Sequence, residues 1–254
     1  MVENRTNVRR ILVPSQPTYL AWPGYFARLI GADEIALMDD VQFVRQGWQH
    51  RNRIWDPAVG QRMLTIPVMK KGRYDQRIDE VQIAAAGWEQ KHLRQITQAY
   101  PKLRLRGQSG ERIQEFYAHS FEWLRDANEA FIDMVIDLLQ IDIKVTRSST
   151  LNVTGKKTER LLDMCDKTGC NVMRLGPGAL DYLDLSMINE AGVELEILRT
   201  ASVPPNPDAD PDLSRLSIVD TLLRHDTDSR SILEGDYWLE KVVTSPAVEA
   251  AGQR

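Results

Sequence analysis

The stretch that decides the fold is residues 11–54, ILVPSQPTYLAWPGYFARLIGADEIALMDDVQFVRQGWQHRNRI. It opens with the apolar run 11–13, which predicts a short buried strand. Turn residues and aromatic side chains follow, and a helix is then predicted over about 25–30. A second apolar run, 34–38, predicts another strand that ends at two aspartates. This order predicts the start of a βαβ unit, whose parallel strands are joined in a right-handed sense.

The rest of the chain continues this alternation of short strands and helices. We predict further strands at 62–68, 78–83, 141–145, 171–175 and 193–198, and helices at 88–100, 110–139, 159–167 and 214–223. The pattern predicts an α/β fold with a mainly parallel sheet, flanking helices and a helical insertion or subdomain in the middle of the chain. The expected parts are an N-terminal α/β half with the site at 10–86, the helical insertion at 87–140, a C-terminal α/β half at 141–240 and a disordered tail at 241–254.

The composition limits the kinds of partner. With 254 residues, 43% of them hydrophobic and 27% charged, the chain can bury a sizeable core. A net charge of −4 gives no overall field that attracts nucleic acid. No stretch approaches the roughly 20 apolar residues of a membrane-spanning helix, and the N-terminus lacks the apolar segment of a signal peptide. We therefore expect a cytoplasmic protein with neither nucleic acid nor membrane as a partner.

The cysteines and histidines form no metal-binding pattern. The two cysteines, Cys165 and Cys170, lie five residues apart, and the four histidines are scattered. A reducing compartment also argues against a disulfide between the cysteines. We expect no bound metal.

Polar side chains follow each of the first two predicted strands. Ser15, Gln16 and Tyr19 come after the first strand, and Asp39, Asp40 and Gln42 come after the second. Because ligands of parallel sheets bind beyond the carboxyl ends of the strands, these side chains are the strongest candidates for a site. An aspartate there would act as a general base or hold a substrate ammonium group. The alternative is a solvated turn that simply ends the strand.

Other residues of the opening block have two interpretations each. The Gln16 amide would bind a substrate carbonyl or hydroxyl, or else bridge loop backbones. Tyr19 and Trp22 belong to the core or the pocket wall, with stacking on a sugar or a base as the other possibility. Arg51 and Asn52 would bind a phosphate or a carboxylate.

Candidates also occur later in the chain. Lys156, in the sequence GKKT at a helix start, would bind an anion or belong to an ordinary helix cap. Asp181 and Tyr182 follow a Gly-Pro-Gly turn that either lines the site or is only a turn. Cys165 would be a nucleophile with His92 or His50 as its base. The alternatives are a core cysteine and a hydrogen-bonded histidine on a helix.

Several segments resemble the WbqC-like family of bacterial proteins. They are PSQPTYLAWPGYF at 14–26, DDVQFVRQGWQHRNRI at 39–54, MLTIPV at 63–68, WEQKH at 88–92, SSTLNVTGKKTERLLDMC at 148–165 and GPGALDYLD at 176–184. Members of that family are associated with O-antigen and natural-product gene sets. The resemblance covers roughly residues 10–225 and implies transfer of an acyl or aminoacyl group, such as glycyl, to an amine or hydroxyl.

These features together predict a transferase that takes an acyl group from a carrier-protein thioester. Asp39 or Asp40 would be the base, and Gln16 and Asn52 would orient an acceptor that is a sugar or a small metabolite. Arg51 and Lys156 would hold the phosphate of the phosphopantetheine arm, and no other cofactor is expected.

The carrier protein is the expected macromolecular partner, docked on the basic segment 91–112. A homodimer stays open. Two other classes stay open as well. One is an ATP-dependent ligase whose aspartate pair anchors magnesium. The other is a non-catalytic sugar-binding or scaffold protein.

Overall fold

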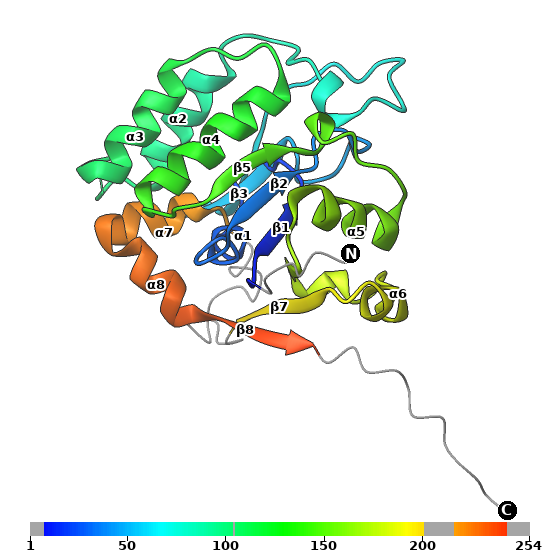
Figure 1. The fold of residues 1–254 in the computed structure, drawn as a ribbon. Helices are drawn as coiled ribbons and strands as arrows, with labels where there is room; N and C mark the ends of the chain where they lie inside the picture. Colours follow the sequence, from blue (N-terminus) through cyan, green and yellow to red (C-terminus); the bar gives the residue numbers. More distant parts are fainter. Residues whose placement is uncertain (1–7, 104, 201–215, 243–254) are drawn as a thin grey trace, which may run out of the picture.

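The computed structural model describes residues 8–103, 105–200 and 216–242. Among these residues the main sheet has six strands in the order β5-β2-β1-β6-β7-β8 (Figure 1). Neighbouring strands are parallel, except that β8 runs antiparallel to β7. The predicted α/β fold with a mainly parallel sheet is therefore confirmed.

The elements are short, and most are joined by brief loops. The strands of the main sheet are β1 (Ile11–Ser15), β2 (Glu34–Leu37), β5 (Lys144–Arg147), β6 (Val172–Leu175), β7 (Glu194–Thr200) and β8 (Tyr237–Val242). A separate antiparallel hairpin consists of β3 (Arg51–Asp56) and β4 (Gly60–Thr65). The helices are α1 (Pro23–Ala27), α2 (Trp88–Ala99), α3 (Gly107–Ala118), α4 (Leu124–Leu138), α5 (Lys157–Thr168), α6 (Leu185–Glu190), α7 (Ile218–His225) and α8 (Ser229–Asp236). The 3-10 turns are η1 (Ile78–Glu80), η2 (Ser148–Thr150), η3 (Pro177–Ala179) and η5 (Asp226–Asp228).

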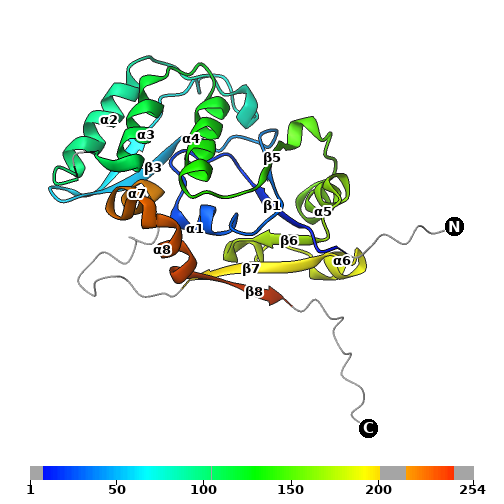
Figure 2. The ribbon, with the colours of Figure 1, turned by 60° about the vertical axis from the view of Figure 1, so that its left-hand side comes forward.

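The two faces of the main sheet contact different helices. Successive side chains of a strand point to opposite faces, so Ile11 and Val13 of β1 lie in one core and Leu12 in another. The larger core is completed by α1 to α4, α7 and α8, and the smaller one by α5 and α6. Figures 1 and 2 show these two groups of helices on opposite sides of the sheet. The layers are therefore helix, sheet and helix.

Two predicted elements differ from the structure for identifiable reasons. The segment 78–83 was predicted as a strand, but it begins with the turn η1, in which the Glu80 carboxylate accepts a hydrogen bond from the Arg77 backbone N–H at 2.8 Å. The helix predicted at 110–139 is two helices, α3 and α4, separated at 119–123. Asn128, a residue with low helix propensity, lies inside α4, and its amide donates to other segments.

The C-terminal part contains two elements that the sequence pattern did not predict. The helix α8 follows α7, and β8 adds an antiparallel edge to β7. Residues 241 and 242 of the predicted disordered tail belong to β8. The remainder of that tail, 243–254, lies outside the described residues.

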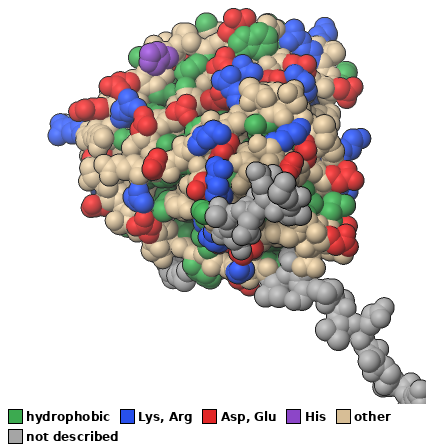
Figure 3. All heavy atoms as spheres, viewed as in Figure 1, with side chains coloured by type: hydrophobic (Ala, Val, Ile, Leu, Met, Phe, Trp, Pro, Cys, Tyr) green, Lys and Arg blue, Asp and Glu red, His purple; other side chains and the backbone are tan. Residues whose placement is uncertain are grey.

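The surface does not carry a field of one sign on the face shown in Figure 3. Basic and acidic side chains are interspersed there, in keeping with the small net charge. Within the described ranges, no helix combines the length and the apolar character needed to cross a lipid bilayer.

Candidate functional site

The sheet changes its direction of growth at β1. The next strand along the chain, β2, lies on one side of β1, whereas β6 lies on the other. Ligands of open α/β sheets bind at such a switch point, beyond the carboxyl ends of the strands. A cavity of about 640 Å³ opens there and is bordered by Ser15, Leu175 and Thr200 at the ends of β1, β6 and β7. Its volume lies in the usual range for small-molecule sites.

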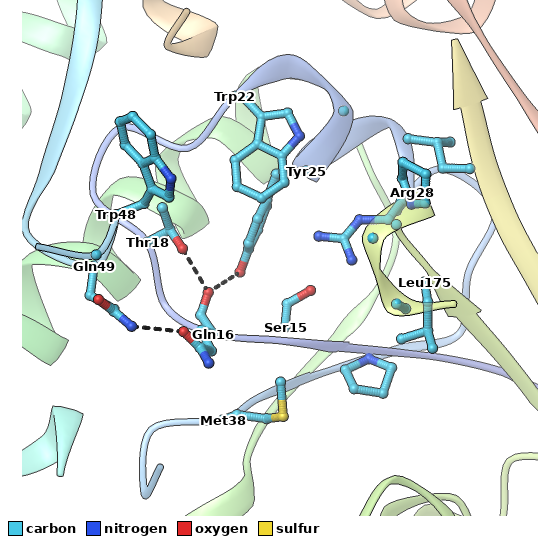
Figure 4. A pocket seen from close by; sticks show the side chains of 18 of the residues that line it. Ser15, Gln16, Thr18, Trp22, Tyr25, Arg28, Met38, Trp48, Gln49 and Leu175 are labelled. Atoms are coloured by element: carbon cyan, nitrogen blue, oxygen red, sulfur yellow. Dashed lines mark hydrogen bonds between the residues drawn. The ribbon is translucent and has the colours of Figure 1, made fainter. Parts of the chain in front are cut away.

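Aromatic side chains form much of the cavity wall. They are Trp22, Tyr25, Trp48, Tyr182 and Tyr237. In the view of Figure 4, Trp22 and Trp48 lie on one side of the cavity and Met38 lies on the other. Flat apolar faces of this kind bind rings and alkyl chains without selecting a particular polar pattern. Selectivity must therefore come from the few polar groups among them.

Two amides line the cavity and bind each other. The Gln49 side-chain N–H donates to Oε1 of Gln16 at 2.8 Å (Figure 4). The other amide atom of Gln49, Oε1, is buried and has no hydrogen-bond partner among the described residues. The same is true of Oγ of Ser15. Buried polar atoms are nearly always paired in folded proteins, so these two atoms mark places where a ligand would complete the hydrogen bonding.

Two arginines line the cavity: Arg199 on β7, which pairs with Glu240, and Arg28, the residue that follows α1. Arg28 is 7% exposed, and its guanidinium lies over the rings of Tyr25 and Trp22, at 5.3 and 5.9 Å from their centroids. Figure 4 shows the guanidinium pointing into the space between Tyr25 and Leu175. Among the described residues no carboxylate pairs with it, and burial lowers the pKa of its guanidinium.

A second buried arginine fixes the backbone from which Arg28 projects. Arg174 on β6 donates to the backbone oxygens of Arg28 and Ile30, at 3.0 and 2.8 Å. Its Nε donates to Glu196 on β7 at 2.9 Å. Arg174 is thus neutralised by a carboxylate, whereas Arg28 is not.

The loop between β1 and α1 is held in place by buried amides. The Asn52 amide donates to the backbone oxygens of Leu20 and Tyr19, at 2.7 and 3.3 Å. The Asn128 amide donates to the backbone oxygen of Pro17 at 3.1 Å. Leu20 has a φ of +46°, which is unusual for a residue with a side chain. These hydrogen bonds from Asn52 and Asn128 hold the loop in its unusual backbone conformation.

The structure does not bring the predicted aspartate pair to the cavity. Asp39 is fully buried and accepts hydrogen bonds from the Ser149 N–H and hydroxyl, at 3.0 and 2.7 Å. Asp40 pairs with Arg160 of α5 at 2.5 Å and accepts a hydrogen bond from Ser148. Burial alone would raise the pKa of Asp40, but the bonds from Ser148 and Arg160 hold it below its usual range. Both carboxylates tie η2 and α5 to the end of β2.

His92 and Tyr19 lie together in the core beside the cavity. The Tyr19 hydroxyl bonds to Nδ1 of His92 at 2.8 Å and to the Tyr117 hydroxyl at 2.6 Å. Both His92 and Tyr19 are buried, and neither lines the cavity. Burial, with a smaller effect of the Lys91 charge, lowers the pKa of His92 to about 4. The ring is therefore neutral near pH 7 and serves as a hydrogen-bond partner.

The later candidates are dispersed. Cys165 is buried in the smaller core, and burial raises the pKa of its thiol to about 12, which disfavours the nucleophilic thiolate. Lys156 is the exposed residue before α5, and Asp181 is exposed on the turn after β6; neither lines the cavity. Tyr182, next to Asp181, does line it.

Arg51 belongs to a cationic cluster on the other side of the loop 44–50. Lys70 lies 2.9 Å from Nε2 of His50, and Arg45 donates to the Lys70 backbone oxygen at 2.6 Å. The Arg51 guanidinium donates to the backbone oxygen of Gln46. Burial, followed by the charges of Lys70 and Arg51, lowers the pKa of His50 to about 4. Gln42 is exposed and also lies away from the cavity.

The cavity thus collects four of the predicted site residues, Gln16, Trp22, Asn52 and Tyr182. Ser15, which was also expected after the first strand, lines the cavity too, whereas Arg28, Trp48 and Gln49 were not among the predicted site residues. Arg28 could not be recognised, because an arginine within a short predicted helix gives no sign of being buried.

The described residues offer no metal site. Within 8–103, 105–200 and 216–242, no group of three or more histidine, cysteine, aspartate or glutamate side chains is placed to hold an ion.

Fold and site define an α/β protein with a cavity of small-molecule size at its topological switch point. The chain belongs to the WbqC-like protein family, whose sequence model matches residues 16–232. It is similar to the uncharacterized protein Rv1507c of Mycobacterium tuberculosis (strain ATCC 25618 / H37Rv). The two are 27% identical over 181 residues, which cover 71% of this chain and 78% of that protein. No solved structure matches the chain.

Proposed function

We propose that the protein is an acyl- or aminoacyltransferase whose acceptor is a sugar or small metabolite bound in this cavity. The observation that supports this most is the position of the cavity at the switch point of the sheet, where α/β enzymes hold their substrates. The resemblance of the opening block to the WbqC-like family supplies the type of reaction. The donor is an acyl thioester on a carrier protein.

The proposed reaction asks little of the protein beyond orientation. The acceptor nitrogen or oxygen attacks the thioester carbonyl, a C–N or C–O bond forms, and the thiol leaves as the C–S bond breaks. The proton lost by the acceptor is taken up by the leaving sulfur or by water. Holding two reactants in register contributes much of the rate of such a step. Gln16, Gln49 and the aromatic wall would provide that orientation.

A non-catalytic binding protein is the second candidate, and one observation favours it. None of the four residues predicted to be catalytic, Asp39, Asp40, His92 and Cys165, lines the cavity. A cavity that offers hydrogen bonds and stacking without a side chain of suitable pKa can bind a ligand and leave it unchanged. The two candidates differ in whether a thiol is released.

The proposal is tested by mixing the purified protein with a glycyl-loaded carrier protein and an amino sugar, and measuring free carrier thiol. We expect release that depends on the acceptor. Gly176→Phe should lower the rate by at least about tenfold, because a ring there enters the cavity from a position with open space around the new Cβ. Gly235→Phe is the matched control, since its Cβ also meets open space but lies on α8 outside the cavity.

Two results would contradict acyl transfer. Stabilisation by ATP and magnesium without thiol release would favour a ligase. Binding of the amino sugar without thiol release, lost in Gly176→Phe, would favour the binding protein.

A further inference from the structure

We propose that the cavity recognises its small molecule by a phosphate or carboxylate group that pairs with Arg28. This inference rests on the proposed function only in placing the ligand in the same cavity. It adds the chemical class of the ligand and names the residue that selects it.

The first observation is the burial of Arg28 without an anion. The residue is 7% exposed and its guanidinium faces the cavity; Tyr25 and Tyr182 lie near it, but among the described residues no carboxylate pairs with it. A guanidinium has five N–H donors and stays charged under all ordinary conditions. A buried cation that lacks a counterion is costly, so one that persists beside a cavity calls for a partner from outside the fold.

The second observation is the contrast with Arg174. Arg174 is 3% exposed and is fully engaged, with Glu196 on one side and two backbone oxygens on the other. The fold therefore neutralises a buried arginine where the arginine has a structural role. The Arg28 backbone oxygen accepts one of these bonds, but its guanidinium lies over the rings of Trp22 and Tyr25 and near Tyr182. Such rings attract a cation but leave its N–H donors free.

The third observation is the unpartnered hydroxyl of Ser15. Its Oγ is buried and lines the same cavity; the Tyr25 hydroxyl approaches it but donates to the backbone oxygen of Gln16, so the Ser15 O–H is free to donate to a ligand. Figure 4 shows this hydroxyl on the floor of the cavity on the side from which Arg28 enters. An oxyanion accepts hydrogen bonds from a guanidinium and from a hydroxyl at the same time. Ser15 and Arg28 thus offer complementary donors for one anionic group.

The rest of the cavity fits a ligand that is anionic at one end only. Gln49 leaves an acceptor, Oε1, without a partner among the described residues, and this atom suits an amine or a hydroxyl. Trp48 lies beside Gln49 in the lining and provides an apolar face. A sugar phosphate, a nucleotide-linked sugar and an amino acid all have this combination of groups.

The test compares thermal unfolding of the wild type with inorganic pyrophosphate, inorganic phosphate or acetate, each against potassium chloride at equal ionic strength. We expect a phosphate or the carboxylate to raise the melting temperature by roughly 5 °C when present at 100 times its dissociation constant. The phosphate arms and the acetate arm distinguish the two kinds of anion. Arg28→Met should abolish the specific response, leaving only the general stabilisation that such salts give any folded protein. Arg28→Lys should keep part of it.

A second readout needs no ligand. If Arg28 is kept for binding, Arg28→Met should melt at or above the temperature of the wild type, because it removes an unpaired buried charge. Arg174→Met is the matched variant and should melt lower by roughly 6 °C or more, because it removes the buried pair with Glu196 and the bonds to the Arg28 and Ile30 backbone, and leaves Glu196 to the more exposed Arg9.

The inference is overturned if no anion stabilises the wild type beyond chloride, or if Arg28→Met keeps the full response. It is also overturned if Arg28→Met loses as much stability as Arg174→Met, since Arg28 would then be structural. Anion binding without thiol release would contradict acyl transfer and support the anion site. Thiol release without anion binding would support acyl transfer and contradict the anion site.

Discussion

The guanidinium of Arg174 donates to the backbone oxygen of Arg28 at 3.0 Å. One buried arginine, neutralised by Glu196, therefore fixes the end of the helix from which another reaches into the cavity. The link joins β6 and β7 to α1 across the switch point of the sheet.

This link predicts a large stability loss for Glu196→Gln. Removing the carboxylate leaves the Arg174 guanidinium buried without a counterion, which should lower the free energy of unfolding by about 3 kcal/mol. Denaturant unfolding monitored by circular dichroism measures this change. Glu240→Gln, which breaks the more exposed pair with Arg199, should cost less than about 1 kcal/mol. Equal losses for the two variants would show that the Arg174 pair has no special role.

Asp40 is expected to support the fold rather than the chemistry. Asp40→Asn loses charge-assisted hydrogen bonds to Arg160 and Ser148 and should lower the free energy of unfolding by about 2 kcal/mol. Because the pKa of Asp40 is lowered in the fold, its contribution is present above about pH 4 and is lost as the pH falls through the folded-state pKa. Urea unfolding of both proteins from pH 7 to pH 3.5 should show the difference shrinking only at the acid end. A difference that is constant across the range would refute this.

Two buried histidines predict acid sensitivity above the range in which carboxylates titrate. His92 and His50 have pKa values lowered to about 4, so the fold favours their neutral forms. The stability that each contributes is present above the unfolded-state pKa of about 6.5 and is lost as the pH falls toward 4. For each of these two histidines, lowering the pH from 7 to 5 should reduce the free energy of unfolding by about 2 kcal/mol.

The check is the unfolding free energy of His92→Gln across the same pH range. Between pH 7 and pH 5, the free energy of unfolding of His92→Gln should fall by about 2 kcal/mol less than that of the wild type. His119→Gln replaces an exposed histidine and is the control. An identical slope for His92→Gln and the wild type would contradict the burial effect.

Cys165 should be inert toward thiol reagents in the folded protein. Burial raises the pKa of its thiol to about 12, so almost no thiolate is present at pH 8. Mass spectrometry after iodoacetamide treatment should find Cys165 modified only after unfolding. Rapid modification in the native protein, together with loss of transfer in Cys165→Ala, would restore a covalent mechanism.

The fold could be predicted largely from local patterns, and the site only in part. Apolar runs that end in polar residues reveal a parallel sheet, because a strand buried on both faces tolerates few polar side chains. The polar residues after β1 do reach the cavity, at Ser15 and Gln16. The aspartates after β2 do not, because Ser148, Ser149 and Arg160 approach them from segments more than 100 residues away. Sequence proximity contains no information about such distant partners.

Arg28 illustrates the same limit from the other side. Nothing in the sequence PGYFARLI distinguishes it from a solvated helix residue. Its burial follows from the packing of α1 beneath β7 and α8, which the local pattern does not specify. A buried charge that lacks a counterion can be recognised only from the structure, because its neighbours come from distant parts of the sequence.

The proposed function places the acceptor in the cavity at the end of β1, away from the aspartate pair at the end of β2. The most direct measurement is the rate of acceptor-dependent thiol release by Asp40→Asn and by Gly176→Phe, both at a temperature where each variant is folded. We predict a rate near that of the wild type for Asp40→Asn and a loss of at least about tenfold for Gly176→Phe. Loss of thiol release in Asp40→Asn with an unchanged rate in Gly176→Phe would contradict acceptor binding in the cavity and would place the reaction at the aspartates.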